Sequence, residues 1–433
     1  MIGTFINAWK IADLRKKMLF TALIVLIFRI GAAIPVPFTN ITGSGIVDPT
    51  GETFMNYLSM MTGDAFNYGT IFAMSVTPYI NSSIIIQLLT VAIPALEKLS
   101  KEGEEGRKKI ATITRYTTIA LALLQSTAYF IYLRAKGYVV TDAEGQLFTG
   151  FSAVLQALVV ITVLTAGSAF IMWLGEQVND KGIGNGVSII LFAGIVARMP
   201  TLVYMMYAYL MQGGAYFALV PIVIILMLAM IAYIVWMDNA ERRIPVQYAK
   251  RVVGRKMYGG QSTHIPMKVL AVGVLPLIFA YSFMAFPGTI MAMFGTNSGA
   301  YKWWSTNMNQ FTWGYMLLCA LLIVAFSYFY TAITFNPQDI AKNLQQQGGH
   351  IPGIRSGQPT IEFLSRTSNR LTLFAAIFLA VLSTVPSVLT VWRSVSIPFG
   401  ASSILIAVSV ALESMQQIEA QLTMRHYKGF LQN

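Results

Sequence analysis

The ionisable residues of this chain are few and lie outside its most apolar stretches. The sequence has 433 residues with 18 Asp and Glu and three histidines, His264, His350 and His426. All of these groups fall in polar connections or near the ends of apolar runs. Ion-driven transporters usually carry such groups at membrane depth, where they relay protons or bind ions. The distribution therefore disfavours a secondary transporter with broken helices, which we keep as the alternative function.

The sequence also lacks the motifs of common catalytic and nucleotide-binding sites. It contains no G-x-x-x-x-G-K-[ST] and no H-E-x-x-H. Its single cysteine, Cys319, excludes a disulfide framework and a thiolate metal cluster. We expect no catalytic residues, no metal site and no cofactor, so a membrane enzyme ranks third among the functions considered. Any work that the protein performs would draw its energy from a partner.

Apolar runs of membrane-spanning length dominate the chain. Hydrophobic residues make up 55% of the sequence, with a mean hydropathy of +0.61. A helix needs about 20 apolar residues to cross a bilayer. The predicted fold class is an all-α polytopic membrane protein with ten transmembrane helices, at approximately 18–36, 70–94, 110–133, 150–174, 184–208, 216–237, 269–290, 311–334, 371–391 and 396–413.

The basic residues predict the orientation of these spans. With ten spans, one side of the membrane would hold 24 of the 30 Lys and Arg, and the other side five. The positive-inside rule then places both termini in the cytoplasm. Topology alone can explain most of this asymmetry and of the net charge of +12. The segment 238–268 has seven basic residues, more than orientation requires, and indicates a docking surface for an acidic or nucleic-acid partner.

Two segments depart from regular spans. Residues 54–66 are apolar but too short to cross, so they form either a re-entrant piece inside the protein or an interfacial helix on the outer surface. The run 181–186, Lys-Gly-Ile-Gly-Asn-Gly, has no preceding strand and is no dinucleotide fingerprint. Its glycines predict close backbone packing or bending at the start of the fifth span. Arg198 interrupts that span and is a candidate for its outer end.

Two long cytoplasmic connections are candidate contact points. Alternation in 242–251 predicts an extended hairpin arm within 238–268. In the connection 335–370, the turn-rich run 348–357 predicts a tip that presents Arg355. Loops on rigid scaffolds commonly carry function.

Several of these segments, in order along nearly the whole chain, resemble the SecY family of protein-conducting channel subunits in its bacterial form. V-T-P-Y-I-N-S-S-I-I-I-Q-L-L resembles the family's second span, and G-I-G-N-G-V-S-I-I-L-F-A-G-I-V its fifth. The other four matches lie in the cytoplasmic loops and the tail. Together the six matching segments are 76–89, 182–196, 242–251, 261–268, 351–355 and 419–430.

The resemblance implies a function and an architecture. Two inverted five-helix halves, 1–210 and 211–433, would surround a central pore in the bacterial plasma membrane. The channel would be passive. It would move unfolded secretory polypeptides with signal peptides across the membrane and release transmembrane segments sideways into membrane lipid. The implied partners are the SecE and SecG subunits, the SecA motor ATPase and the translating ribosome.

The resemblance also implies a ring of aliphatic residues at the pore. Carried over, the ring falls on Ile80, Ile84, Val187, Leu191, Ile278 and Ile406. The first two pairs are each four residues apart and so share a helix face. An apolar constriction admits ions poorly, and its side chains make no sequence-specific bonds. Without the resemblance, ordinary packing between helices would be the preferred interpretation of such pairs.

The remaining functional residues come from the same resemblance. The plug falls on the short segment described above: Phe54, Met55, Asn56, Tyr57, Leu58, Ser59, Met60, Met61, Thr62 and Gly63. The lateral gate falls between the second and seventh spans, at Gln87, Thr90, Ser282 and Phe286. A buried interhelical hydrogen bond is the alternative role for Gln87 and Ser282, worth about 0.6 kcal/mol. Partner docking falls on Arg243, Arg255, Lys256 and Arg355, for which topology or solvated charge is the alternative.

Overall fold

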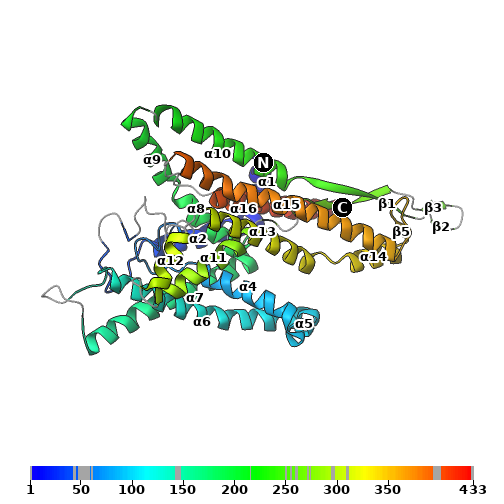
Figure 1. The fold of residues 1–433 in the computed structure, drawn as a ribbon. Helices are drawn as coiled ribbons and strands as arrows, with labels where there is room; N and C mark the ends of the chain where they lie inside the picture. The colour runs from blue at the N-terminus through cyan, green and yellow to red at the C-terminus, as the bar shows by residue number, and fades with distance from the viewer. Residues whose placement is uncertain are drawn as a thin grey trace.

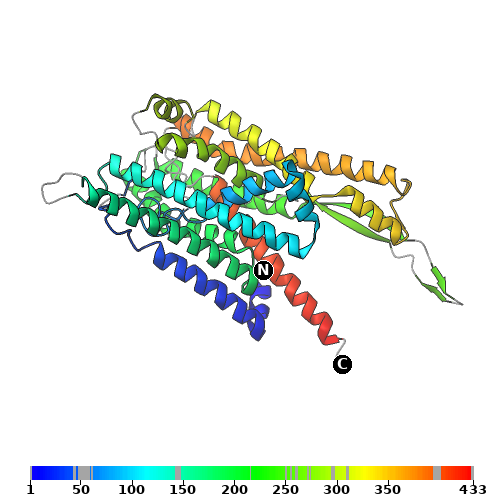
Figure 2. The ribbon, with the colours of Figure 1, turned by 90° about the horizontal axis from the view of Figure 1, so that it is seen from below.

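The structure is a computed structural model, and the parts of the chain that it describes form a bundle of helices. It describes residues 2–41, 45–46, 59, 62–141, 148–214, 216–248, 251–253, 256–258, 262–270, 273, 275–293, 298–308, 312–393 and 401–430. The helices lie side by side along one main direction, and a strand-built arm projects from one end of the bundle (Figure 1). The perpendicular view shows α5, α14 and the arm at that same end (Figure 2).

Every predicted span contains a helix. The first half of the chain forms α1 (Ile2–Lys10), α2 (Ala12–Gly31), α4 (Thr77–Ala92), α5 (Pro94–Lys101), α6 (Glu104–Ala135), α7 (Phe151–Lys181), α8 (Gly186–Ala197) and α9 (Met199–Gln212). The second half forms α10 (Tyr216–Asp238), α11 (Leu275–Met293), α12 (Gly299–Asn307), α13 (Trp313–Thr334), α14 (Pro337–Gln346), α15 (Gln358–Arg393) and α16 (Ala401–Phe430).

Length and hydropathy qualify a smaller number of these helices as spans. Six described helices are long and apolar enough to cross a membrane, or seven if α4 and α5, which meet at a 101° bend, count as one. The polytopic all-α class is thus confirmed, while the count of ten stays a prediction. The second predicted span was wrong at its start, since residues 70–76 form turns and the helix begins only at Thr77. Left-handed backbone at Gly69 and Ser75 keeps this stretch out of the helix.

The glycine-rich run before α8 produces the close packing that its sequence predicts. A Cβ at Gly186 would overlap the backbone of Gly175, so α7 and α8 meet there with backbone against backbone. Asn185 caps α8, because its side chain accepts hydrogen bonds from the backbone N–H groups of Val187 and Ser188. The Asn179 side chain accepts a hydrogen bond of 2.8 Å from the N–H of Gly186. The contact with Gly175 and these three hydrogen bonds therefore fix where α8 begins.

The hairpin arm is confirmed. Strand β1 (Glu241–Tyr248) pairs antiparallel with β4 (Ser262–Lys268), with Ile244 opposite Ile265 in the register. The short β5 (Gly349–His350) joins the other edge of β1, which gives the order β4-β1-β5. At the tip, β2 (Arg251–Val253) pairs with β3 (Lys256–Tyr258). Ile244 and Val246 are buried in a cluster that includes Leu344 of α14 and Leu364 of α15, so the root of the arm packs on both helices.

We expect Gly186→Ala to destabilise the protein by about 1–3 kcal/mol, because the added methyl group forces α7 and α8 apart. Gly299→Ala is the matched control, since a Cβ at Gly299 would meet nothing within 4 Å. Thermal unfolding in mild detergent measures the difference. Equal unfolding temperatures for the two variants would contradict the close approach.

Candidate functional site

The six predicted ring residues belong to one large apolar cluster. Ile80 and Ile84 come from α4, Val187 and Leu191 from α8, and the remaining two from α11 and α16. Five of them are at most 6% exposed, and Val187 is partly buried against the same cluster. The structure thus brings together side chains that are more than 300 residues apart in the sequence.

The four helices that carry the predicted ring residues are in contact with one another in at least two places. Helix α4 contacts α11, and α8 contacts α16. The cluster also contains residues with no predicted pore role, such as Phe279, Leu379 and Met230. Burial in it fits a closed constriction and fits interhelical packing equally, so the ring assignment stays a prediction.

Helices α4 and α11, which carry the four predicted gate residues, are in contact. Both α4 and α6 lie against α11. Gln87 donates from Nε2 to Ser83 Oγ at 3.2 Å, and Thr90 Oγ1 donates to the Ile86 carbonyl at 2.7 Å, so both bonds stay within α4. Ser282 is buried, and no hydrogen bond joins it to Gln87 among the described side chains. A seam without such bonds separates at lower cost.

Phe286, the fourth predicted gate residue, belongs to α11, but its side chain lies outside the described part of the structure. The predicted plug is described only at Ser59, Thr62 and Gly63. The rest of the predicted plug lies outside the described residues: Phe54, Met55, Asn56, Tyr57, Leu58, Met60 and Met61. Ser59 and Thr62 are each 1% exposed, which favours a re-entrant piece over a segment on the outer surface.

An ion pair next to the plug residues was missed by the sequence analysis. Arg198 Nε lies 3.0 Å from Asp64 Oδ2, and Gly63 lies against the backbone of Gly194 in α8. Arg198 itself ends α8 and precedes α9. The sequence signalled Arg198 as an interruption of a span. Nothing in it indicated Asp64 as the partner, because 134 positions separate the two residues.

The docking residues differ in what surrounds them. Arg243 is exposed on β1 and donates from Nε to Glu241 Oε1 at 2.6 Å, so part of its charge is offset. Arg355 is exposed in the turn before α15 and forms no ion pair with the described acidic residues. The hydroxyl of Thr360 donates to the Arg355 carbonyl at 2.9 Å and fixes the turn. Arg255 lies outside the described residues, and Lys256 is described only in its backbone.

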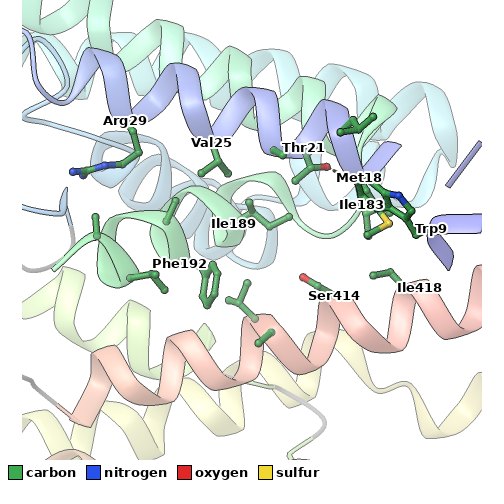
Figure 3. Close-up of a pocket in the computed structure, with 17 residues that line it drawn as sticks. Trp9, Met18, Thr21, Val25, Arg29, Ile183, Ile189, Phe192, Ser414 and Ile418 are labelled. Carbon is green, nitrogen blue, oxygen red and sulfur yellow. Dashed lines mark hydrogen bonds between the residues drawn. The ribbon is translucent and has the colours of Figure 1, made fainter. Parts of the chain in front are cut away.

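An apolar groove of about 620 Å³ runs between α2, α8 and α16. Trp9 and Arg29 lie at its opposite ends, with Val25, Ile189 and Phe192 between them (Figure 3). Its polar side-chain groups belong to Thr21, Arg29, Ser414 and the indole N–H of Trp9. Within the described residues, no group of three or more His, Cys, Asp or Glu could hold a metal ion.

The sequence is similar throughout to translocase subunits. The SecY family profile matches residues 70–415. The protein translocase subunit SecY of Streptomyces galbus is 41% identical over 437 residues, which cover all of both chains.

Two solved structures share the fold at lower identity. A protein-conducting channel matches with a TM-score of 0.68 at 19% identity, covering 94% of this chain and 92% of the other. Sec61 in a canine ribosome–channel complex from the endoplasmic reticulum matches with a TM-score of 0.64 at 17% identity, also covering 94% and 92%.

Proposed function

Because this chain belongs to the SecY family, it is a subunit of a protein-conducting channel and no enzyme, and we propose how its parts carry out transport. The full-length similarity to translocase subunits carries this conclusion, and it leaves the secondary transporter without support. The protein is a multi-pass membrane protein, and its bacterial relatives imply the plasma membrane.

We propose two five-helix halves, 1–210 and 211–433, with both termini in the cytoplasm. The asymmetry of Lys and Arg supports this orientation. The arm, α5 and α14 lie at one end of the bundle (Figure 2), as cytoplasmic connections would. The polypeptide would pass between the halves, through the centre of the apolar cluster.

The six ring residues form the proposed ion seal. Their side chains are aliphatic, and a narrow apolar neck excludes water and ions when it is empty. The same lack of polar groups lets the neck fit around any unfolded sequence, since it offers no specific bonds. Phe54–Gly63 is the proposed plug of this neck. Its described residues, Ser59, Thr62 and Gly63, pack inside the protein.

The seam of α4 against α11 is the proposed lateral gate, marked by Gln87, Thr90, Ser282 and Phe286. Its support is the contact between α4 and α11 together with the absence of a bond between Gln87 and Ser282. Apolar contacts between helices can be replaced by lipid tails with little loss, because both are equally apolar. Signal peptides and transmembrane segments would enter the membrane lipid through this seam.

We assign the arm and the adjoining turn to docking of the SecA motor or the ribosome, through Arg243, Arg255, Lys256 and Arg355. The similarity to Sec61 of a ribosome–channel complex supports a ribosome partner. SecE and SecG are the proposed membrane subunits. Along α2 the groove extends from Met18 to Arg29, about 17 Å at the helical rise, which suits a crossing helix such as that of SecE.

Replacing Ile84, Ile278 and Ile406 together by serine should open a leak for monovalent ions, because hydroxyl groups let water occupy the neck. The plug could mask this leak, so the test uses the triple variant with and without residues 57–63. Single-channel conductance in planar bilayers is measured for the variants and for the plug deletion alone.

The matched control replaces Ile222, Ile225 and Leu228 by serine, three residues on the exposed face of α10. These changes should leave conductance at the level of the unmodified protein. If the ring variant without the plug conducts no more than the plug deletion alone, the three isoleucines are packing residues and the pore lies elsewhere.

Arg355→Glu should weaken binding of the motor by roughly 30-fold or more, since leaving a charge unpaired at an interface costs at least about 2 kcal/mol. Arg366→Glu, at an exposed position on α15, is the control and should change binding little. ATP hydrolysis by SecA in the presence of the channel, and secretion into membrane vesicles, are the measurements. Unchanged values for Arg355→Glu would remove this residue from the docking surface.

A further inference from the structure

We propose that Arg198 is a positioning residue. Its ion pair with Asp64, the latch, holds the end of the plug segment against α8 in the closed channel, and opening breaks this pair. The inference rests on the proposed function and adds to it the interaction that holds the closed state. Only the described residues Ser59 and Thr62–Phe66 on one side, and α8 with Arg198 on the other, enter the argument.

The ion pair is more sheltered than any other among the described residues. Arg198 Nε lies 3.0 Å from Asp64 Oδ2, and the two side chains are 19% and 20% exposed. In each of the other ion pairs at least one partner is 49% exposed or more. Exposed pairs contribute little because water screens them, whereas partly buried pairs are screened much less. This pair therefore has more influence on the position of its segment than surface pairs have.

The carboxylate of Asp64 is held ready for the arginine by its own segment. Ser59 Oγ donates to Asp64 Oδ1 at 2.9 Å, which leaves Oδ2 for Arg198. The N–H of Asp64 donates to the Ser59 carbonyl at 2.9 Å. Gly63 and Asp64 have φ angles of 64° and 69°, in the left-handed region, where a non-glycine residue such as Asp64 is uncommon. These bonds and this turn direct the carboxylate at α8.

Backbone contact brings the same turn onto the helix that carries Arg198. A Cβ at Gly63 would lie 2.7 Å from the Gly194 carbonyl oxygen, so the two glycines touch directly. Gly194 is four residues before Arg198 and lies on the same face of α8. The turn is therefore held at two points on one helix face, by van der Waals contact at Gly194 and by charge at Arg198.

The chain just beyond the latch is attached to a different helix by neutral contacts. Tyr129 of α6 donates from its hydroxyl to the Phe66 carbonyl at 2.6 Å, and the two rings lie 4.6 Å apart. Both side chains are at most 4% exposed. Phe66 thus stays with α6, while Asp64 depends on a charge pair with α8. Separation of α8 from the turn would break the pair and leave the Phe66 attachment in place.

The latch is suited to release. Among the described residues, buried Arg198 Nη1 has no hydrogen-bond partner, so this nitrogen takes no part in a two-point pair with the carboxylate. Arg198 is seven residues beyond Leu191 on α8, about 10 Å at the helical rise. A polypeptide that widens the proposed ring at Leu191 would act on the same helix that holds the turn.

The test combines resting conductance with protein transport, using the assembled channel in planar bilayers and vesicles. The variants are Asp64→Asn, Arg198→Gln, their combination and Arg198→Lys. Each single neutral variant should raise the resting open probability about tenfold, which corresponds to about 1.4 kcal/mol. The combination should leak no more than the stronger single variant, because both remove one interaction. Arg198→Lys keeps the charge and should stay close to the unmodified protein.

Glu176→Gln is the control, since it removes another interhelical ion pair, with Arg115, that is remote from the turn. It should leave resting conductance unchanged. Resting conductance of Asp64→Asn at the unmodified level, or a leak in the combination equal to the product of the two single effects, would overturn the latch. Thermal unfolding of each variant, compared with that of Glu176→Gln, separates a released plug from general loss of structure. A leak that accompanies general unfolding, and that Arg198→Lys shares, would also overturn it.

Transport of a secretory polypeptide by the unmodified channel distinguishes failure of the latch from failure of the proposed function. If the unmodified channel transports it and the neutral variants stay closed, the latch is wrong and the proposed function stands. If the unmodified channel fails to transport any polypeptide with its motor present, the proposed function itself is wrong.

Discussion

The bilayer core contains no water, so every backbone polar group inside it must find a partner within the protein, and the rest of this structure depends on that constraint. Helices meet the requirement by themselves. Non-helical backbone meets it only where other parts of the protein surround it. The turns at 62–76 are such a case: Val36 N–H donates to the Gly69 carbonyl, Ile71 N–H to the Ile34 carbonyl, and Ser168 Oγ to the Ser75 carbonyl. This inner segment can therefore lie among the helices although it is not helical itself.

The side chains of the large cluster meet through non-directional apolar contacts. The large cluster around Ile84, Leu191 and Ile278 is apolar, and the seam between α4 and α11 lacks the Gln87–Ser282 bond. Contacts of this kind exclude ions when closed and can be exchanged for those of a passing chain. Directional interactions occur instead at the edges of the centre, at Asp64 with Arg198 and at Phe66 with Tyr129. The apolar side chains of the proposed seal are thus distinct from the polar contacts at Asp64 and Phe66.

Sequence patterns predicted the features that depend on local periodicity. Hydropathy located a helix in every predicted span, and alternation predicted the β1–β4 arm. The glycines of 181–186 predicted close backbone packing or bending, and the structure shows close packing of α8 on α7. The start of α4 could not be predicted in this way, because residues 70–76 are as apolar as a span. Their departure from helix depends on left-handed backbone at Ser75, which hydropathy does not register.

The candidate site was predictable only in part. The six ring residues came from a resemblance, and the structure adds that they belong to one buried cluster. The Asp64–Arg198 pair lay beyond prediction because it depends on how a turn is folded against a helix from a distant part of the chain. Pairings of that kind are set by tertiary packing and leave no local pattern in the sequence.

The central claim is that polypeptides pass through the centre of the apolar cluster and leave sideways between α4 and α11. Photo-crosslinking from a secretory polypeptide stalled in transit tests it most directly, with one reactive residue in the signal segment and one in the trailing chain. The account predicts that the signal segment labels α4 and α11, and that the trailing chain labels α8 near Leu191. Labelling of the exposed face of α10 by both positions, with none at Leu191, would contradict it.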